Sequence, residues 1–109
     1  MGRKFDRRQF IRKGRIMEKL VITRHMALYQ YLINKGYVEK GTRCISHASE
    51  KDVIGKHVYG VVPYWLASKA EKYTEIQLRI PHNKKGKELT LKEVEFYALR
   101  PRTYKVIEV

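Results

Sequence analysis

Three consecutive polar residues, Thr23, Arg24 and His25, carry the side chains of this chain that are best suited to chemistry. They follow the apolar residues 20–22, which are typical of a buried strand, and they precede an apolar spacing typical of a helix. A hydroxyl, a guanidinium and an imidazole at a strand-to-helix turn can hold an anion together. The helix start adds backbone N–H groups and a partial positive charge. The triplet therefore predicts an anion site.

The overall charge of the chain also favours a polyanionic partner. Its 109 residues include 24 Lys and Arg against 11 Asp and Glu, which gives a net charge of +13. Residues 1–16 hold seven of these basic residues and one acid. We expect them to form a basic N-terminal extension that the folded core does not need, and residues 17–109 to form a single domain.

Cysteine usage and hydropathy indicate where the protein works. The single cysteine, Cys44, excludes an internal disulfide and fits a reducing compartment. No apolar run reaches the roughly 18 residues of a membrane-spanning helix. We therefore expect a cytoplasmic protein without a membrane partner.

The hydrophobic pattern alternates strands with helices. Strands are predicted at residues 19–23, 42–46, 57–62, 75–80 and 104–109, and helices at residues 25–35, 64–72 and 90–99. Thr23 or Arg24 is the expected cap of the first helix, Pro63 opens the second, and Thr90 with Glu93 forms a capping box on the third. This order predicts a three-layer α/β domain with a mostly parallel sheet of about five strands and about three helices.

The ends of the predicted strands bring further polar residues toward the triplet. In an open α/β sheet, ligands bind beyond the carboxyl ends of the strands. The later strands and the loops after them supply Ser46, His47, Pro63, Tyr64, Asn83, Lys84 and Lys85. Two imidazoles, an arginine, several lysines and two helix starts at one edge of the sheet predict a phosphate site.

Acidic residues are too few and too scattered for a metal-dependent nuclease. Asp6 and Asp52 are the only aspartates, whereas a two-metal site needs clustered carboxylates. One cysteine and scattered histidines give no zinc pattern, so we expect neither a metal nor a cofactor. RNA suits such a site, because its own 2′-hydroxyl can attack the neighbouring phosphorus. Arg or Lys then neutralises the charge, and His protonates the leaving oxygen.

Several short motifs occur in a fixed order along residues 18–109. They are Val-Ile-Thr-Arg-His at 21–25 followed by Ala27, Gly-Lys at 55–56, Gly-Val-Val-Pro at 60–63 with Leu-Ala at 66–67, and Ile-Pro at 80–81 before Gly-Lys-Glu-Leu-Thr at 86–90. Together they resemble the small stand-alone type III CRISPR accessory family called Csx-sixteen.

The resemblance implies a Rossmann-like fold and a ring nuclease that works as a homodimer. Such proteins degrade cyclic oligoadenylate, typically cyclic tetra-adenylate, the second messenger of type III CRISPR complexes. Its degradation switches off antiviral signalling. The implied partner is therefore this cyclic RNA, and no DNA is expected.

Carried over by position, the resemblance places Arg24 and His25 of the Thr-Arg-His motif at the scissile phosphate. His47 is a further catalytic candidate, and Asn83 and Lys84 are candidate ligand contacts. Lys85 stands where the family is expected to have an arginine before glycine. Lysine keeps the charge but loses the bidentate fork.

Two alternatives remain open at this point. The domain could hold cyclic oligoadenylate or RNA through the same basic edge without cutting it. Histidine phosphatases also place Arg-His after a first strand, although a glycine usually follows where this chain has Met26.

Overall fold

A five-stranded sheet with the order β2-β1-β3-β4-β5 forms the centre of the computed structural model, which describes residues 17–109. The strands are β1 (Lys19–Ile22), β2 (Arg43–Ile45), β3 (His57–Gly60), β4 (Lys72–Glu75) and β5 (Arg102–Tyr104). The pairs from β2 to β4 are parallel and β5 is antiparallel to β4, which confirms the mostly parallel sheet. The basic extension expected at residues 1–16 lies outside the described residues.

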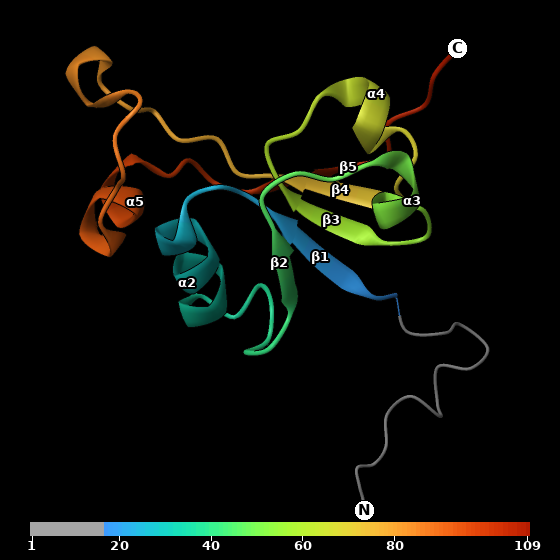
Figure 1. Cartoon of the computed structure of the whole chain (residues 1–109), viewed down its shortest axis with the longest axis horizontal. Helices are drawn as coiled ribbons and strands as arrows, with labels where there is room; N and C mark the ends of the chain where they lie inside the picture. Colours follow the sequence, from blue (N-terminus) through green and yellow to red (C-terminus); the bar gives the residue numbers. More distant parts are fainter. Residues whose placement is uncertain (1–16) are drawn as a thin grey trace, which may run out of the picture.

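Helices cover both faces of this sheet and make three layers (Figure 1). On one face lie α2 (Met26–Asn34) and α5 (Leu91–Tyr97), and on the other lie α3 (Glu50–Val53) and α4 (Tyr64–Ala67). Each face has its own apolar cluster, because successive strand residues point to opposite sides. In β1, Val21 packs in the cluster under α2 and α5, while Leu20 and Ile22 pack in the cluster under α3 and α4. The three-layer α/β prediction is thus confirmed.

Residues 17–109 contain four α-helices, where about three were expected. The additional helix, α3, is a single turn between β2 and β3, where the sequence predicts no helix. The backbone N–H of Ser49 donates to Asp52 Oδ2 at 2.8 Å, and Val53 is fully buried against the sheet. The predicted capping box of α5 is confirmed, since Thr90 and Glu93 each accept the other's backbone N–H, at 3.1 and 2.9 Å. No helix of residues 17–109 has the length and apolar character to cross a membrane.

The second predicted helix and the fourth predicted strand were placed wrongly. Helix α4 ends at Ala67 rather than near Lys72, and β4 begins at Lys72 rather than at Glu75. The backbone N–H groups of Glu71 and Lys72 both donate to the carbonyl of Lys56, at 2.9 and 3.3 Å, so the chain is already back at the sheet. The alternating residues 76–80 continue beyond β4 as an extended segment.

The N–H of Ile76 still donates to the carbonyl of Gly60 in β3, at 3.2 Å, and the rest of this extended segment pairs with the end of α5. Leu78 bridges antiparallel to Ala98, and the N–H of Leu99 donates to the carbonyl of Gln77 at 2.9 Å. The N–H of Arg79 donates to the carbonyl of Tyr97, also at 2.9 Å. The last predicted strand, residues 104–109, also lies earlier than expected, as β5.

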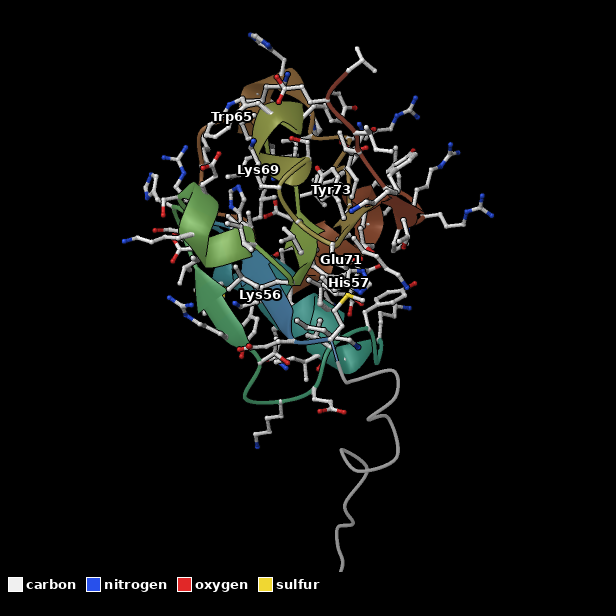
Figure 2. All side chains as sticks on the ribbon, turned by 90° about the vertical axis from the view of Figure 1, so that its right-hand side faces the viewer. Lys56, His57, Trp65, Lys69, Glu71 and Tyr73 are labelled. Atoms are coloured by element: carbon white, nitrogen blue, oxygen red, sulfur yellow. The ribbon has the colours of Figure 1, made fainter. Side chains whose placement is uncertain are left out.

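His57 lies at the amino end of β3, next to Lys56 and Glu71 (Figure 2). Its ring stacks on Tyr59 with centroids 4.4 Å apart, and its Nε2 lies 2.6 Å from Thr74 Oγ1. Burial, followed by the charges of Lys72 and Lys19, lowers the pKa of His57 to about 4. The folded protein therefore keeps this imidazole neutral in mildly acidic solution.

We expect the free energy of unfolding to fall as pH is lowered from about 6.5 to about 4. In this window the unfolded chain takes up a proton on His57 and the folded chain does not, so acid favours unfolding. The loss amounts to roughly 1–3 kcal/mol, given that the ring is partly exposed. Urea titrations at pH 7, 5 and 4 measure it.

The matched variants for this titration are His57→Gln and His82→Gln. His57→Gln can still hydrogen-bond to Thr74 and should flatten the pH dependence between 4 and 6.5. His82 is exposed in the 3₁₀ turn η1 (His82–Lys84), and its replacement should leave the slope as it is. An unchanged slope in His57→Gln would contradict the assignment.

Candidate functional site

A cavity of about 660 Å³ opens at the carboxyl end of the sheet. Most of its lining comes from the residues that directly follow β1, β2, β3 and β4, and Ile22, Leu28 and Leu99 complete it. The chain passes from β1 to β2 on one side and then crosses to β3 on the other, so the sheet reverses its order beside β1. Ligands of open α/β folds bind at such a reversal, beyond the carboxyl ends of the strands.

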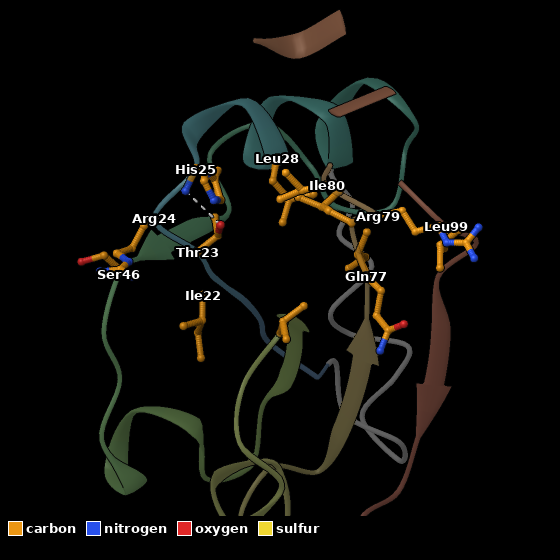
Figure 3. A pocket seen from close by; sticks show the side chains of 13 residues that line it. Ile22, Thr23, Arg24, His25, Leu28, Ser46, Gln77, Arg79, Ile80 and Leu99 are labelled. Carbon is orange, nitrogen blue, oxygen red and sulfur yellow. Dashed lines mark hydrogen bonds between the residues drawn. The ribbon is translucent and has the colours of Figure 1, made fainter. Parts of the chain in front are cut away.

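The Thr-Arg-His triplet forms one side of this cavity. The N–H of Thr23 donates to the carbonyl of Ile45 at 3.0 Å and so continues the pairing of β1 with β2. Thr23 Oγ1 accepts the backbone N–H of His25 at 3.0 Å, which holds the turn into α2 (Figure 3). His25, rather than the predicted Thr23 or Arg24, is the N-cap of α2, and its imidazole is half-buried in the cavity lining.

Two arginines lie on opposite sides of the cavity (Figure 3). Arg24 follows β1, whereas Arg79 belongs to the extended segment after β4, and both are exposed. Neither guanidinium forms an ion pair with a carboxylate of residues 17–109. No acidic side chain from the described part of the chain, residues 17–109, lines the cavity. The positive charge of this site is therefore available to an anionic ligand.

The remaining lining combines neutral polar and apolar side chains. Thr23, Ser46 and Gln77 supply hydroxyl and amide groups, and the apolar residues are Ile22, Leu28, Val61, Ile76, Leu78, Ile80 and Leu99. A cavity of this size with few polar groups among apolar ones is typical of small-molecule sites. Cationic groups beside apolar surface suit the phosphate and the base of a nucleotide respectively.

The structure brings some of the predicted site residues together and leaves others outside. Thr23, Arg24, His25 and Ser46 line the cavity, and His47 Nδ1 lies 3.1 Å from Ser46 Oγ at its margin. The predicted residues that do not themselves line it are His47, Pro63, Tyr64, Asn83, Lys84 and Lys85.

Lys84 has a different neighbour. Its Nζ lies 2.6 Å from Glu93 Oε2 on α5, and this contact raises the pKa of Lys84 while lowering that of Glu93. The pair ties the loop after β4 to the helix that supports the segment 76–80. In this conformation Lys84 therefore stabilises the surroundings of the cavity.

Sequence reasoning missed Gln77 and Arg79. The alternation of apolar Ile76, Leu78 and Ile80 with polar residues predicts a strand over 75–80, and the end of that strand would lie at the loop 82–87. The same alternation places Gln77 and Arg79 on one side of an extended chain. An expected start of the strand at Lys72 would have assigned both residues to the carboxyl edge.

Groups suited to metal binding or thiol chemistry do not gather at this site. Among residues 17–109, no three His, Cys, Asp or Glu side chains lie close enough to hold a metal ion. Cys44 is half-buried in β2, and burial raises the pKa of its thiol, as expected for a structural cysteine.

Comparison with known families fits this arrangement. Residues 20–107 match the family model described as "Putative CRISPR-associated protein (Cas_VVA1548)", and this match contains the whole cavity. The chain belongs to this family. Membership in the Cas_VVA1548 family confirms the CRISPR association that the sequence motifs implied. No curated protein and no solved structure matches the chain.

Proposed function

We propose that this protein is a ring nuclease that cleaves cyclic oligoadenylate, with cyclic tetra-adenylate as the first candidate, and so switches off type III CRISPR signalling. One observation carries the proposal: at the ligand-binding edge of a CRISPR-associated α/β domain lies a cavity with a histidine and two arginines, and within residues 17–109 no carboxylate lines it or pairs with these arginines. Its charge and its mixed polar and apolar lining suit an RNA ligand.

The cavity residues provide the groups that RNA cleavage without a metal requires. The 2′-hydroxyl of the ligand attacks the neighbouring phosphorus in line, forms the P–O2′ bond and breaks the P–O5′ bond. Arg24 and Arg79 neutralise the charge that develops on the phosphoryl oxygens. His25 protonates the leaving 5′-oxygen, and His47, held by Ser46, accepts the proton of the 2′-hydroxyl. The products are a 2′,3′-cyclic phosphate and a 5′-hydroxyl.

The proposal includes a homodimer, because a cyclic ligand with a two-fold axis matches a two-fold protein assembly. Each subunit would then contact one half of the ring. Sedimentation with and without cyclic tetra-adenylate measures this association. A monomer that cleaves the ring at full rate would contradict the dimeric arrangement.

Incubation of the purified chain with labelled cyclic tetra-adenylate in EDTA tests the central claim. We expect linear products that end in a 2′,3′-cyclic phosphate. A ring that stays intact for hours, although it binds, would establish the alternative, a binding module without catalysis. Cleavage that occurs only after a divalent metal ion is added would contradict the proposed mechanism.

Arg79→Ala should weaken binding of the ring about tenfold, the effect of losing one charged hydrogen bond of about 1.4 kcal/mol. Arg79→Lys should recover part of this loss, because lysine keeps the charge without the bidentate geometry. Equilibrium binding with a slowly cleaved analogue of the ring measures the effect. Equal affinity of wild type and Arg79→Ala would remove Arg79 from the site.

A further inference from the structure

A second cavity, of about 480 Å³, adjoins the one already described. Gln77 and Leu99 line both cavities, so the two share one wall. The other side chains of the second cavity come from α4, the end of β4 and the region of β5. A ligand that fills the first cavity can therefore extend into the second across Gln77.

Two tyrosines give the second cavity exposed aromatic surface. Tyr64 in the first turn of α4 is 62% exposed, and Tyr104 at the end of β5 is 41% exposed. Most tyrosines bury their rings, so two open rings in one cavity are available to a planar ligand. Bases of single-stranded nucleic acids stack on such rings.

Hydrogen-bonding groups in the same cavity favour adenine among the bases. The amide of Gln77 can give one hydrogen bond to a ring nitrogen and accept one from an amino group, a pairing that adenine presents. Glu75, at the end of β4, adds a carboxylate that only accepts hydrogen bonds and so suits an exocyclic amine. Hypoxanthine has an oxygen in place of that amine and would meet the carboxylate with a second acceptor.

Two further arginines keep this cavity attractive to a phosphodiester. Arg100 and Arg102 line it, and neither pairs with a carboxylate of residues 17–109. Arg102 lies opposite Glu75 in the pairing of β4 with β5, so this carboxylate has a cation beside it. The charge balance therefore remains positive.

We propose that the second cavity binds the adenine base of a nucleotide whose phosphate lies in the first cavity. This inference rests on the proposed function and names the base specificity of that site. The open rings of Tyr64 and Tyr104 stack the base, Gln77 and Glu75 read its amino edge, and Arg102 contacts the next phosphate.

Calorimetric titration of the full chain with the dinucleotides pApA and pIpI tests the inference. The two probes differ only in the adenine or hypoxanthine bases. We expect pApA to bind about tenfold more tightly than pIpI, the discrimination of one good pair of hydrogen bonds. Gln77→Leu should reduce the preference for pApA, because leucine cannot distinguish the bases and only Glu75 is left to do so.

The stacking role is tested with neighbouring aromatic residues of α4. Tyr64→Ala should weaken binding of both dinucleotides by about 5- to 100-fold. Trp65→Ala is the matched control, because Trp65 is also 62% exposed but does not line the cavity. Equal binding of pApA and pIpI by wild type, no binding of either, or equal effects of the two substitutions would overturn the inference.

The experiments distinguish failure of the adenine site from failure of the proposed nuclease activity. If cyclic tetra-adenylate stays intact in EDTA while pApA is preferred over pIpI, the nuclease activity fails and the adenine site stands. If the ring is cleaved while pApA and pIpI bind equally, the nuclease stands and the adenine site fails.

Discussion

Replacing Arg24 with alanine is expected to slow cleavage of cyclic tetra-adenylate by more than about 100-fold, the usual cost of removing a donor that stabilises transition-state charge. Arg24 stands beside the histidine proposed to protonate the leaving oxygen, and no carboxylate of residues 17–109 competes for its guanidinium. Its charge can therefore act fully on the phosphoryl oxygens. Single-turnover cleavage in EDTA measures the effect without product release.

Arg43→Ala provides a control that loses the same charge. Arg43 lies in β2 and pairs at 3.8 Å with Asp52, on the surface and outside the cavity. Its loss should change the cleavage rate less than twofold or so, as expected for an exposed ion pair. A comparable loss in both variants would mean that overall charge, rather than the position of Arg24, drives the reaction.

Arg24→Lys separates charge from geometry. Lysine supplies a point charge but not two parallel N–H groups, so this variant should cleave at a rate between those of wild type and Arg24→Ala. A fully active Arg24→Ala would show that another cation, such as Arg79, is the main stabiliser.

Gly60→Ala is expected to destabilise the domain by about 3 kcal/mol or more, through backbone strain and a clash with a neighbouring strand. Gly60 ends β3 with φ of +141°, a conformation that residues with a side chain rarely adopt. An added Cβ would lie 2.2 Å from the backbone oxygen of Ile22, which ends β1. The neighbour is backbone, so it cannot move aside without disturbing the strand.

The Gly60→Ala substitution should also disturb the candidate site. Ile22 precedes the Thr-Arg-His triplet directly, and any shift of its carbonyl moves the turn that carries Arg24 and His25. We therefore expect a melting temperature lower by more than about 10 °C, together with weaker ring binding in the protein that remains folded. Thermal unfolding followed by circular dichroism measures the first effect.

Gly86→Ala is the matched control for a glycine with positive φ. Gly86 has φ of +82°, but a Cβ there would meet no atom within 4 Å. Only the conformational cost remains, about 1 kcal/mol. If Gly60→Ala and Gly86→Ala lowered the free energy of unfolding equally, the close approach of β3 to β1 would not contribute to the destabilisation.

The elements that sequence reasoning placed correctly have strong local patterns. Helix α2 shows a clear apolar stripe ended by Gly36, and α5 has its capping box at Thr90. The short helices α3 and α4 have no long apolar stripe, because they form through the tertiary packing of Val53 and Leu66 rather than through helix propensity. The predicted start of β4 lies too far along the chain because Tyr73 and Thr74 are both buried. A strand buried on both faces does not show alternating apolar and polar residues.

The candidate site was predictable only where it depends on the local sequence. The rule that ligands bind beyond the carboxyl ends of the strands located the cavity correctly around Thr23–His25 and Ser46. It failed for Gln77 and Arg79, since their position follows from backbone pairing with residues 97–99, far away in the sequence. Whether Arg24 and His25 cut the ligand remains a prediction for the cleavage assay.

The backbone pairing of residues 77–79 with residues 97–99 also decides how the cavity can move. The triplet side belongs to the sheet. The side with Arg79 is held by two backbone hydrogen bonds to the end of a seven-residue helix, and by Leu78 and Ile80, which pack against the apolar cluster under α2 and α5. A segment held in this way opens at a lower free energy than the strands. The cavity can thus widen to admit a bulky ring while the sheet stays folded. A ligand that contacts Arg24 and Arg79 together would bring the two sides of the cavity closer and so stabilise its closed form.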